Sequence, residues 1–344
     1  MSHSLVTISL ASAKRPLFLG VDVGGTSIKI GLVDDLGQTL GTTKIPTHPE
    51  RTCEDAVGRI AAACREFVAG FSLALTNVAA IGLVTPGTMD IPRGMILEPP
   101  NIPGWRNYPI RDCLSEASGA PVAFANDATA AAFGEWWVGT GRQHHSIVLL
   151  TLGTGVGGGI MVGDVSIDGE NSCGSECGHI IIDYHDDARL CGCGQRGHLE
   201  AYASATAVVK RTNEILAAGG RGVLAEQAAA GESISPLMIA EAAAGGDALA
   251  LDIVLETARY LGIGITSLMH TIDPSAVILG GAMNFGGAEH PLGRQFLARI
   301  RQEVRARAFP VLAERTTIEF ASLGGDAGFI GAAGIARTFY RKQS

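Results

Sequence analysis

Three potential metal ligands and a carboxylate lie within CGCGQRGHLE, the segment from Cys191 to Glu200. Cys191 and Cys193 are too close in sequence to form an unstrained disulfide with each other. Redox motifs have two residues between their cysteines, and here there is one. Two thiolates and an imidazole on a glycine turn can fold round one ion, and His179, twelve residues before Cys191, can complete a tetrahedron. Sulfur with nitrogen selects zinc, and four protein ligands make the site structural. The predicted ligands are His179, Cys191, Cys193 and His198, with Cys173 and Cys177 as nearby competitors.

Glycines at a strand-to-strand turn have the pattern of a phosphate-binding loop. In DVGGTSIK, Gly24 and Gly25 let backbone N–H groups converge on an anion without side-chain obstruction. Asp22 can hold Mg²⁺ through water, Thr26 adds a hydroxyl group, and Lys29 is included among the candidate nucleotide contacts. Because a strand follows, the motif is neither a Walker A loop nor a dinucleotide fingerprint, and a plain glycine hairpin is the alternative.

The same pattern recurs in TLGTGVGGG, where Thr151–Gly155 stands in the place of Asp22–Thr26. We interpret this as an internal repeat, and two such hairpins can close on a polyphosphate from both sides. Two further glycine pairs follow apolar, strand-like segments and could line a purine pocket, since a flat base needs the backbone close by. These turns predict a nucleotide cleft, with the further candidates Gly153, Thr154, Gly155, Gly280, Gly281 and Gly324, the last beside Gly325.

Two pairs of polar residues could handle a hydroxyl-bearing substrate. Asn126 and Asp127 stand between a predicted strand and an alanine-rich helix, where they form a helix N-cap or, for the aspartate, a general base. A phosphate cleft needs a group that activates the acceptor, which favours the base. Glu176 and His179 suit the hydroxyls of a polyol, although a solvated glutamate and a structural histidine fit their spacing equally well.

Hydrophobic periodicity predicts the elements that position these residues. We expect strand–turn–strand segments at 16–34 and 145–163, strands near 78–87, 120–126 and 274–284, and a helix over 53–71. Residues 201–217 and 236–270 are expected to be largely helical, and 322–342 to be a turn followed by a closing helix. Two similar halves that each open on a glycine hairpin predict two α/β lobes facing a cleft. The expected lobes are 1–125, together with a C-terminal helix at 326–344, and 126–325, which carries the zinc loop.

The bulk composition excludes several classes of protein. The chain has 344 residues, of which 47% are hydrophobic and 17% charged, so a sizeable core is expected and disorder is not. A net charge of -8 without any basic block argues against a nucleic-acid partner. The longest charge-free apolar stretch, between Arg259 and Asp273, is too short to cross a bilayer. With seven cysteines and no secretory pattern near the start, we expect a cytoplasmic protein without a disulfide framework.

Six motifs in order resemble those of the ROK family of sugar kinases and sugar-responsive repressors. They are DVGGTSIK, PNIPGW, ANDATAA, TLGTGVGGG, ECGHI and CGCGQRGHLE, and they extend over most of the chain. The last looks like the family's zinc motif, Cys-x-Cys-Gly-x-x-Gly-Cys-x-Glu. Two departures stand out, because His198 replaces the usual third cysteine and Cys177 stands where an apolar residue is more usual.

The resemblance implies two actin-like (ribonuclease-H-like) lobes with an interlobe cleft, and Mg·ATP-dependent phosphoryl transfer to a hexose. The first expectation is a glucokinase that acts on the 6-hydroxyl of glucose, with Asp127 as the catalytic base and the glycine hairpins as phosphate sites. Zinc would pin the loop that presents Glu176 and Glu200 to the sugar, and a homodimer is expected. The implied sugar contacts are Asn101, Asn126, Asp127, Glu176, His179 and Glu200.

Two alternatives stay open at this point. A kinase for fructose, mannose or an N-acetylhexosamine would keep the same chemistry with a differently shaped sugar loop. A sugar-sensing repressor that lacks its DNA-binding domain belongs to another class. The segment ahead of Asp22 holds no basic helix, which argues against the repressor.

Overall fold

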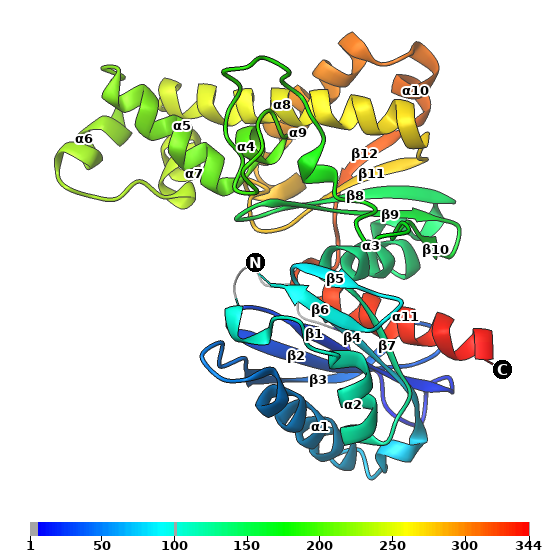
Figure 1. The fold of residues 1–344 in the computed structure, drawn as a ribbon. Coiled ribbons are helices and arrows are strands. Elements are labelled where there is room, and N and C mark those ends of the chain that lie inside the picture. The colour runs from blue at the N-terminus through cyan, green and yellow to red at the C-terminus, as the bar shows by residue number, and fades with distance from the viewer. Residues whose placement is uncertain (1–5, 100–101, 344) are drawn as a thin grey trace. The chain divides into compact units, whose positions relative to one another are not determined.

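The computed structural model describes residues 6–99 and 102–343, which fold into two compact units (Figure 1). Of the described residues, the first unit contains 6–99, 102–143, 159–175 and 322–343, and the second contains 144–158 and 176–321. The lobe boundaries expected from the sequence stay a prediction, because they were drawn from repeated sequence motifs and the two units are defined by compactness. Among the described residues, no helix combines the length and the apolar character needed to span a bilayer.

The first sheet has the strand order β3-β2-β1-β4-β7. The strands β1, β2 and β3 form an antiparallel meander, whereas β4 lies parallel to β1 and β7 parallel to β4. Their bounds are β1 Leu17–Val23, β2 Ser27–Val33, β3 Thr39–Pro46, β4 Val78–Thr85 and β7 Val122–Asn126. A two-stranded hairpin, β5 (Thr88–Asp90) and β6 (Met95–Glu98), completes the strands of this part of the chain.

Alternate residues of β1 serve opposite faces of this sheet, as a strand requires. Leu17, Leu19 and Val21 belong to the buried cluster that includes α1 (Cys53–Ala69) and α2 (Ile110–Ser118). Phe18 belongs instead to the cluster formed with α11 (Ala327–Gln343). Both faces are therefore covered, which explains why β1 reads as a continuous apolar run.

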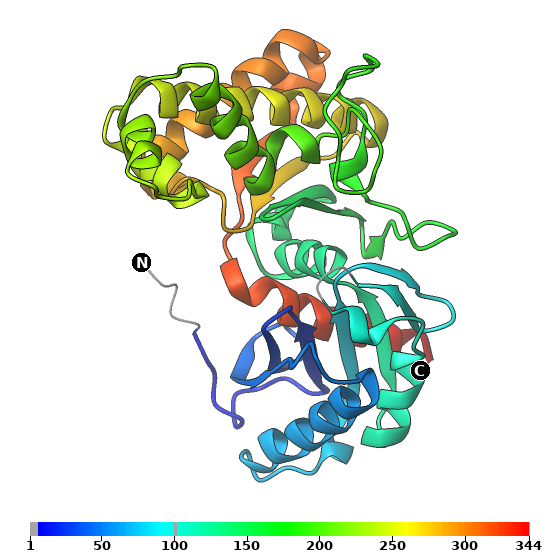
Figure 2. The same ribbon diagram turned by 60° about the vertical axis from the view of Figure 1, so that its left-hand side comes forward.

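The C-terminal helix α11, red in Figure 2, lies against the first sheet and α3 (Asp127–Trp137). Glycines allow its backbone to approach both closely. A Cβ atom at Gly20 would overlap the carbonyl oxygen of Phe329, and one at Gly82 would overlap that of Ala332. A Cβ atom at Gly331, within α11, would overlap the carbonyl oxygen of Ala130. The close contacts of α11 therefore depend on the absence of side chains at these positions.

The second sheet repeats the order of the first, β10-β9-β8-β11-β12. In each sheet the first three strands follow one another as neighbours and the fourth lies parallel beside the first. The bounds are β8 Ser146–Leu152, β9 Val156–Val162, β10 Val165–Ser166, β11 Ala276–Gly280 and β12 Thr317–Phe320. This repeated order confirms the internal repeat and the prediction of two ribonuclease-H-like lobes.

The helices of the second unit lie where the sequence predicts helical structure, but two of the predicted segments are each divided into two helices. The expected helical segment 201–217 is divided at Ser204, whose side chain caps the next helix by accepting from the amide of Ala207. The expected helical segment 236–270 is divided at Gly245-Gly246, before Asp247 caps the longest helix. The helices are α4 Glu200–Ala203, α5 Ala205–Ala217, α6 Val223–Ala229, α7 Pro236–Ala244, α8 Ala248–Ile272, α9 Pro291–Arg307 and α10 Pro310–Arg315.

Candidate active site and metal cluster

The first glycine hairpin joins β1 to β2 through Gly24, Gly25 and Thr26. The Gly24 amide donates to the carbonyl of Ser27 at 3.0 Å, which closes the turn. Asp22 and Lys29 are directly opposed across the two strands. Burial raises the pKa of the Asp22 carboxyl to about 6, and the charge of Lys29 opposes that rise. The hairpin thus carries a buried carboxylate and a cation on neighbouring strands.

The turn that begins α11 lies against this hairpin. Lys29 donates to the carbonyl of Gly325 at 3.1 Å and to the carboxylate of Asp326, and its ammonium group lies 5.1 Å from the ring centroid of Phe329. A Cβ atom at Gly328 would overlap the Asp22 carboxylate. Gly324 opens the same turn with a left-handed φ of 54°. The structure therefore brings the predicted residues Asp22, Lys29 and Gly324 into one region of the first unit.

Sequence reasoning missed Glu135, which fixes this turn from within α3. The residue is fully buried, and its carboxylate accepts from the amide of Leu323 at 2.7 Å and from that of Thr140 at 2.9 Å. The Ser322 hydroxyl donates to it at 3.3 Å. The sequence places this glutamate in a run of alanine and aromatic residues, which indicates a buried position. Because a carboxylate is almost never fully buried without partners, that position predicts a structural role.

The second hairpin, at Gly153–Gly155, is bound directly to one of the predicted sugar contacts. The Gly153 amide donates to the carbonyl of Gly155 at 3.0 Å, one residue nearer along the chain than the acceptor in the first hairpin. Glu200, the first residue of α4, accepts from the amide of Val156 at 2.9 Å. A Cβ atom at Gly155 would overlap the Glu200 carboxylate. The glycine is thus required so that the carboxylate can lie beside the hairpin.

A cavity of about 580 Å³ opens beside this hairpin within the second unit. Its lining includes Gly153 and Thr154, residues of α7, and the segment that begins at Ala282. Gly281 adopts a φ of 90°, and a Cβ atom there would overlap the backbone of Leu152. The predicted pair Gly280-Gly281 thus turns the chain so that the following residues line the cavity, although the two glycines are not themselves in its wall.

Asn126 and Asp127 occupy the junction between β7 and α3. The Ala128 amide donates to the side chains of both residues at 2.8 Å, and the Asn126 amide group donates to the carbonyl of Gly87 at 3.5 Å. The capping interpretation therefore holds for Asn126, and the helix N-terminus favours a negative charge at Asp127. The role of Asp127 as a general base stays a prediction, and Asn101 lies outside the described residues.

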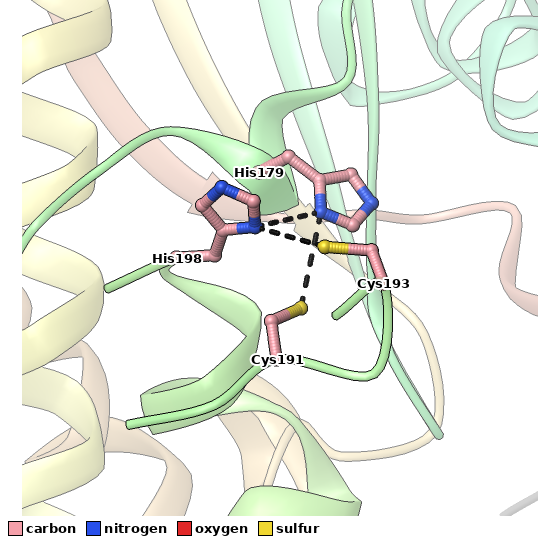
Figure 3. Close-up of side chains that lie close together, drawn as sticks. All are labelled: His179, Cys191, Cys193 and His198. Carbon is pink, nitrogen blue, oxygen red and sulfur yellow. Dashed lines mark hydrogen bonds between the residues drawn. The ribbon is translucent and has the colours of Figure 1, made fainter. Parts of the chain in front are cut away.

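Four of the predicted ligands form a compact cluster in the second unit (Figure 3). The ligand atoms of His179, Cys191, Cys193 and His198 all lie within 4.8 Å of one another. Nδ1 of His198 is 3.2 Å from Nδ1 of His179 and 3.2 Å from Sγ of Cys193. Sγ of Cys191 is 3.9 Å from Nδ1 of His179. Tetrahedral zinc bonds to sulfur and nitrogen place ligand atoms about 3.3–3.8 Å apart, so this donor set fits zinc.

Backbone pairing explains how residues from two parts of the chain meet in the cluster. Ile181 and His198 form a bridge, and the Leu199 amide donates to the carbonyl of Ile180 at 3.0 Å. Gly197 turns with a φ of 81°, and a Cβ atom there would overlap the carbonyl of Asp183. The segments after His179 and before Glu200 are thus held side by side.

Two acidic side chains that were predicted to contact a sugar surround the cluster. Oε2 of Glu176 lies 3.9 Å from Nε2 of His179, which leaves the opposite ring nitrogen toward the cluster. The Cys191 thiol donates to Oε1 of Glu200 at 3.5 Å, so Glu200 contacts both the cluster and the Val156 amide of the hairpin. Burial raises the pKa of the Cys191 thiol to about 11. A bound cation would have to offset that desolvation.

The remaining cysteine of this unit near the cluster is Cys177. It is buried, and burial raises the pKa of its thiol to about 12. It is not among the four residues whose ligand atoms converge. The structure therefore favours His198 over Cys177 in the ligand set.

Comparison with known proteins finds similar sequences and structures over most of the chain. The sequence profile of the ROK family matches residues 18–338. A glucokinase from Halalkalibacterium halodurans is 34% identical over 91% of this chain and 93% of its own. The ROK hexokinase of Thermus thermophilus superposes with a TM-score of 0.80 at 32% identity, covering 95% of this chain and all 100% of its own. A ROK family glucokinase from Streptomyces griseus, in complex with glucose and AMPPNP, gives a TM-score of 0.72 at 37% identity over 94% of this chain and 100% of its own.

Proposed function

Because the chain belongs to the ROK family, we propose that it is an ATP-dependent glucokinase that phosphorylates the 6-hydroxyl of glucose. The observation that carries the proposal is the 37% identity, over 94% of the chain, to a glucokinase solved with glucose and AMPPNP. The duplicated glycine hairpins support the same chemistry, because each can offer backbone N–H groups to a phosphate.

Asp127 is the proposed general base in this reaction. The 6-hydroxyl attacks the γ-phosphorus in line with the leaving ADP oxygen, the new O–P bond forms as the old one breaks, and Asp127 accepts the hydroxyl proton. Asp127 lies in the first turn of α3, next to the Asn126 cap, so the backbone fixes its position before substrate binds. A pre-positioned base does not have to be ordered during the reaction.

The phosphates of the nucleotide are proposed to bind the turns Gly24–Thr26 and Gly153–Gly155. Asp22 would hold Mg²⁺, which neutralises charge on the transferring phosphoryl group. Its buried carboxylate, whose pKa is raised to about 6, gains from a nearby cation and so fits this role. Lys29 is tied to Asp326, so we assign it to balancing charge around Asp22.

The cluster of His179, Cys191, Cys193 and His198 is proposed to hold structural zinc. Four protein ligands fill a tetrahedron, so the ion would stabilise the loop and take no part in the chemical step. His179 and Glu200 are then oriented by the same loop, together with Glu176. The proposed sugar contacts are Asn101, Asn126, Asp127, Glu176, His179 and Glu200. A cytoplasmic homodimer is the expected form.

A panel of hexoses with Mg·ATP, read by ADP release, tests the proposal. We expect glucose to be the best substrate among glucose, fructose, mannose, N-acetylglucosamine and N-acetylmannosamine, with glucose 6-phosphate as the product. Background activity with glucose, beside strong activity with an N-acetylhexosamine, would show that the sugar is wrong while the kinase assignment stands. No ADP release with any sugar would overturn the kinase assignment itself.

A further inference from the structure

The cavity beside the second hairpin is walled mainly by hydrocarbon. Among its lining residues, all of them described, only Thr154, Glu241 and His290 carry polar side chains, and Thr154 belongs to the hairpin itself. Met283 and Phe285 line it and are only 6% and 7% exposed. A ligand in this cavity therefore meets carbon over most of its surface, with few fixed hydrogen-bonding groups to satisfy.

Two features indicate that the cavity receives a ligand. Leu237, on α7, lines the cavity and is 66% exposed, so an occupant would cover apolar surface that water now contacts. Phe285 has a φ of 52°, which is unusual for an aromatic residue and is the kind of strain found at ligand sites. Its ring packs on that of Phe296 with centroids 4.7 Å apart, which holds it in the wall.

The two polar side chains away from the hairpin are at an exposed rim. Glu241 and His290 are both exposed to solvent. Nδ1 of His290 accepts from the Leu292 amide at 3.2 Å, where it caps α9, so in the neutral ring the proton is on Nε2. Hydrogen bonds that a base could make with such exposed groups replace bonds to water and contribute little net free energy.

We infer that this cavity holds the base of the phosphoryl donor and discriminates weakly among purines, so that GTP and ITP replace ATP. The inference rests on the proposed kinase function, since it assigns the donor of that reaction. Sites that hydrogen-bond a substrate group reject analogues that lack it by about 10⁴–10⁵-fold, whereas apolar pockets discriminate by only about 10–200-fold. The structure supplies the second kind of site.

The test compares kcat/KM for ATP, GTP and ITP, each with Mg²⁺ and saturating glucose, on the wild-type protein. We expect GTP and ITP to fall within about 200-fold of ATP, the limit for an apolar pocket. A larger preference for ATP over both would overturn the inference and leave the kinase assignment intact. Calorimetric binding of ADP, GDP and IDP, measured without sugar, extends the test to the case in which no hexose is phosphorylated. Similar affinities for the three support the inference, and no binding of any of them overturns it.

Two variants separate contact with the base from hydrogen-bond readout. Leu237→Ala removes exposed apolar surface, so KM should rise by a similar factor, several-fold, for all three donors. Leu36→Ala, at a leucine that is 54% exposed and outside the cavity, is the matched control and should leave KM unchanged. Glu241→Gln should change the ATP-to-ITP ratio by less than about threefold. A shift of that ratio by tenfold or more would show that Glu241 reads the base and would overturn the inference.

Discussion

The ammonium group of Lys29 is bound by the carboxylate of Asp326, although 297 residues of sequence separate them. Both side chains are 16% exposed, so the pair is largely shielded from water. Lys29 also stands opposite Asp22 in the β1–β2 register. The Lys29 ammonium group therefore balances the charge of two carboxylates. The Lys29–Asp326 pair also connects the start of α11 to the first glycine hairpin.

Asp326→Asn should lower the free energy of unfolding by about 1–3 kcal/mol, because it leaves a partly buried ammonium group without its charged partner. The measurement is chemical denaturation at neutral pH. Asp90→Asn is the matched control, since Asp90 faces Arg93 at 4.0 Å on the surface and should cost less than about 0.5 kcal/mol. Equal effects of the two variants would show that the Lys29–Asp326 pair contributes no more than a surface pair.

Asp22→Asn should stabilise the protein at high pH and not at low pH. The carboxyl pKa is 3.8 in the reference state and about 6 in the fold, so between these values only the unfolded chain releases the proton. Stability therefore falls as pH rises through this window, by about 3 kcal/mol in all for a shift of this size. The measurement is thermal unfolding of the wild type and of Asp22→Asn in Mg²⁺-free buffer, at pH 8 and near pH 4. A variant that changes the midpoint equally at both values contradicts the assignment.

Asp127→Asn should reduce kcat by about 10²–10⁴-fold, since the amide keeps the shape of the side chain but cannot take the proton. Glucose affinity, followed by intrinsic fluorescence, should change much less. The oxygen of the new side chain can still accept from the Ala128 amide, as Asp127 does, so the unfolding midpoint should stay close to that of the wild type. Near-normal turnover would show that Asp127 acts only as part of the helix cap.

His198→Ala should lower both the zinc content and the affinity for glucose, because the same loop holds Glu200. His198→Cys should retain zinc, since thiolate is also a zinc ligand. His185→Ala is the matched control, at an exposed histidine of the same loop that is not in the cluster. Metal analysis of the identically purified proteins, beside glucose titrations, gives the answer. One zinc per chain and normal glucose affinity in His198→Ala would remove His198 from the ligand set.

Gly331→Ala and Gly58→Ala should shift stability in opposite directions. A Cβ atom at Gly331 overlaps the carbonyl of Ala130, so the helices must separate, at a cost of about 1–3 kcal/mol or more. Gly58, within α1, has nothing within 4 Å of the added atom, and alanine should stabilise the helix by about 0.5–1 kcal/mol. Denaturant titrations compare the two directly. A neutral Gly331→Ala would mean that α11 can be displaced without loss.

Local sequence signals predicted the hairpins and most strands because their cause is local. The glycines of Gly24–Thr26 and Gly153–Gly155 mark turns, and the apolar runs beside them mark buried strands. The break at Ser204 was missed because alanine-rich sequence continues a helical pattern through it. The same composition hid the break at Gly245-Gly246, where a cap at Asp247 starts a new helix.

The candidate site divides in the same way. The proposed zinc ligands are close in sequence, and the spacing of Cys191, Cys193 and His198 was enough to predict their convergence. Asp326 was missed because its partner Lys29 is distant in sequence, and only the packing of α11 brings them together. Glu135 binds the equally distant amide of Leu323 in addition to the nearby amide of Thr140. Contacts of this kind are set by tertiary structure and leave no periodic signal.

The placement of α11 has a consequence for how the chain is made on the ribosome. Its residues complete the buried clusters that contain Phe18 and Ala80, yet they are synthesised after the whole of the second unit. One face of the first sheet therefore stays uncovered while residues 144–158 and 176–321 of the second unit emerge and fold. A nascent chain halted before residue 327 would carry a complete second unit and a first sheet with one apolar face exposed to water. Chaperones bind chains with such exposed apolar surface, and proteases degrade them.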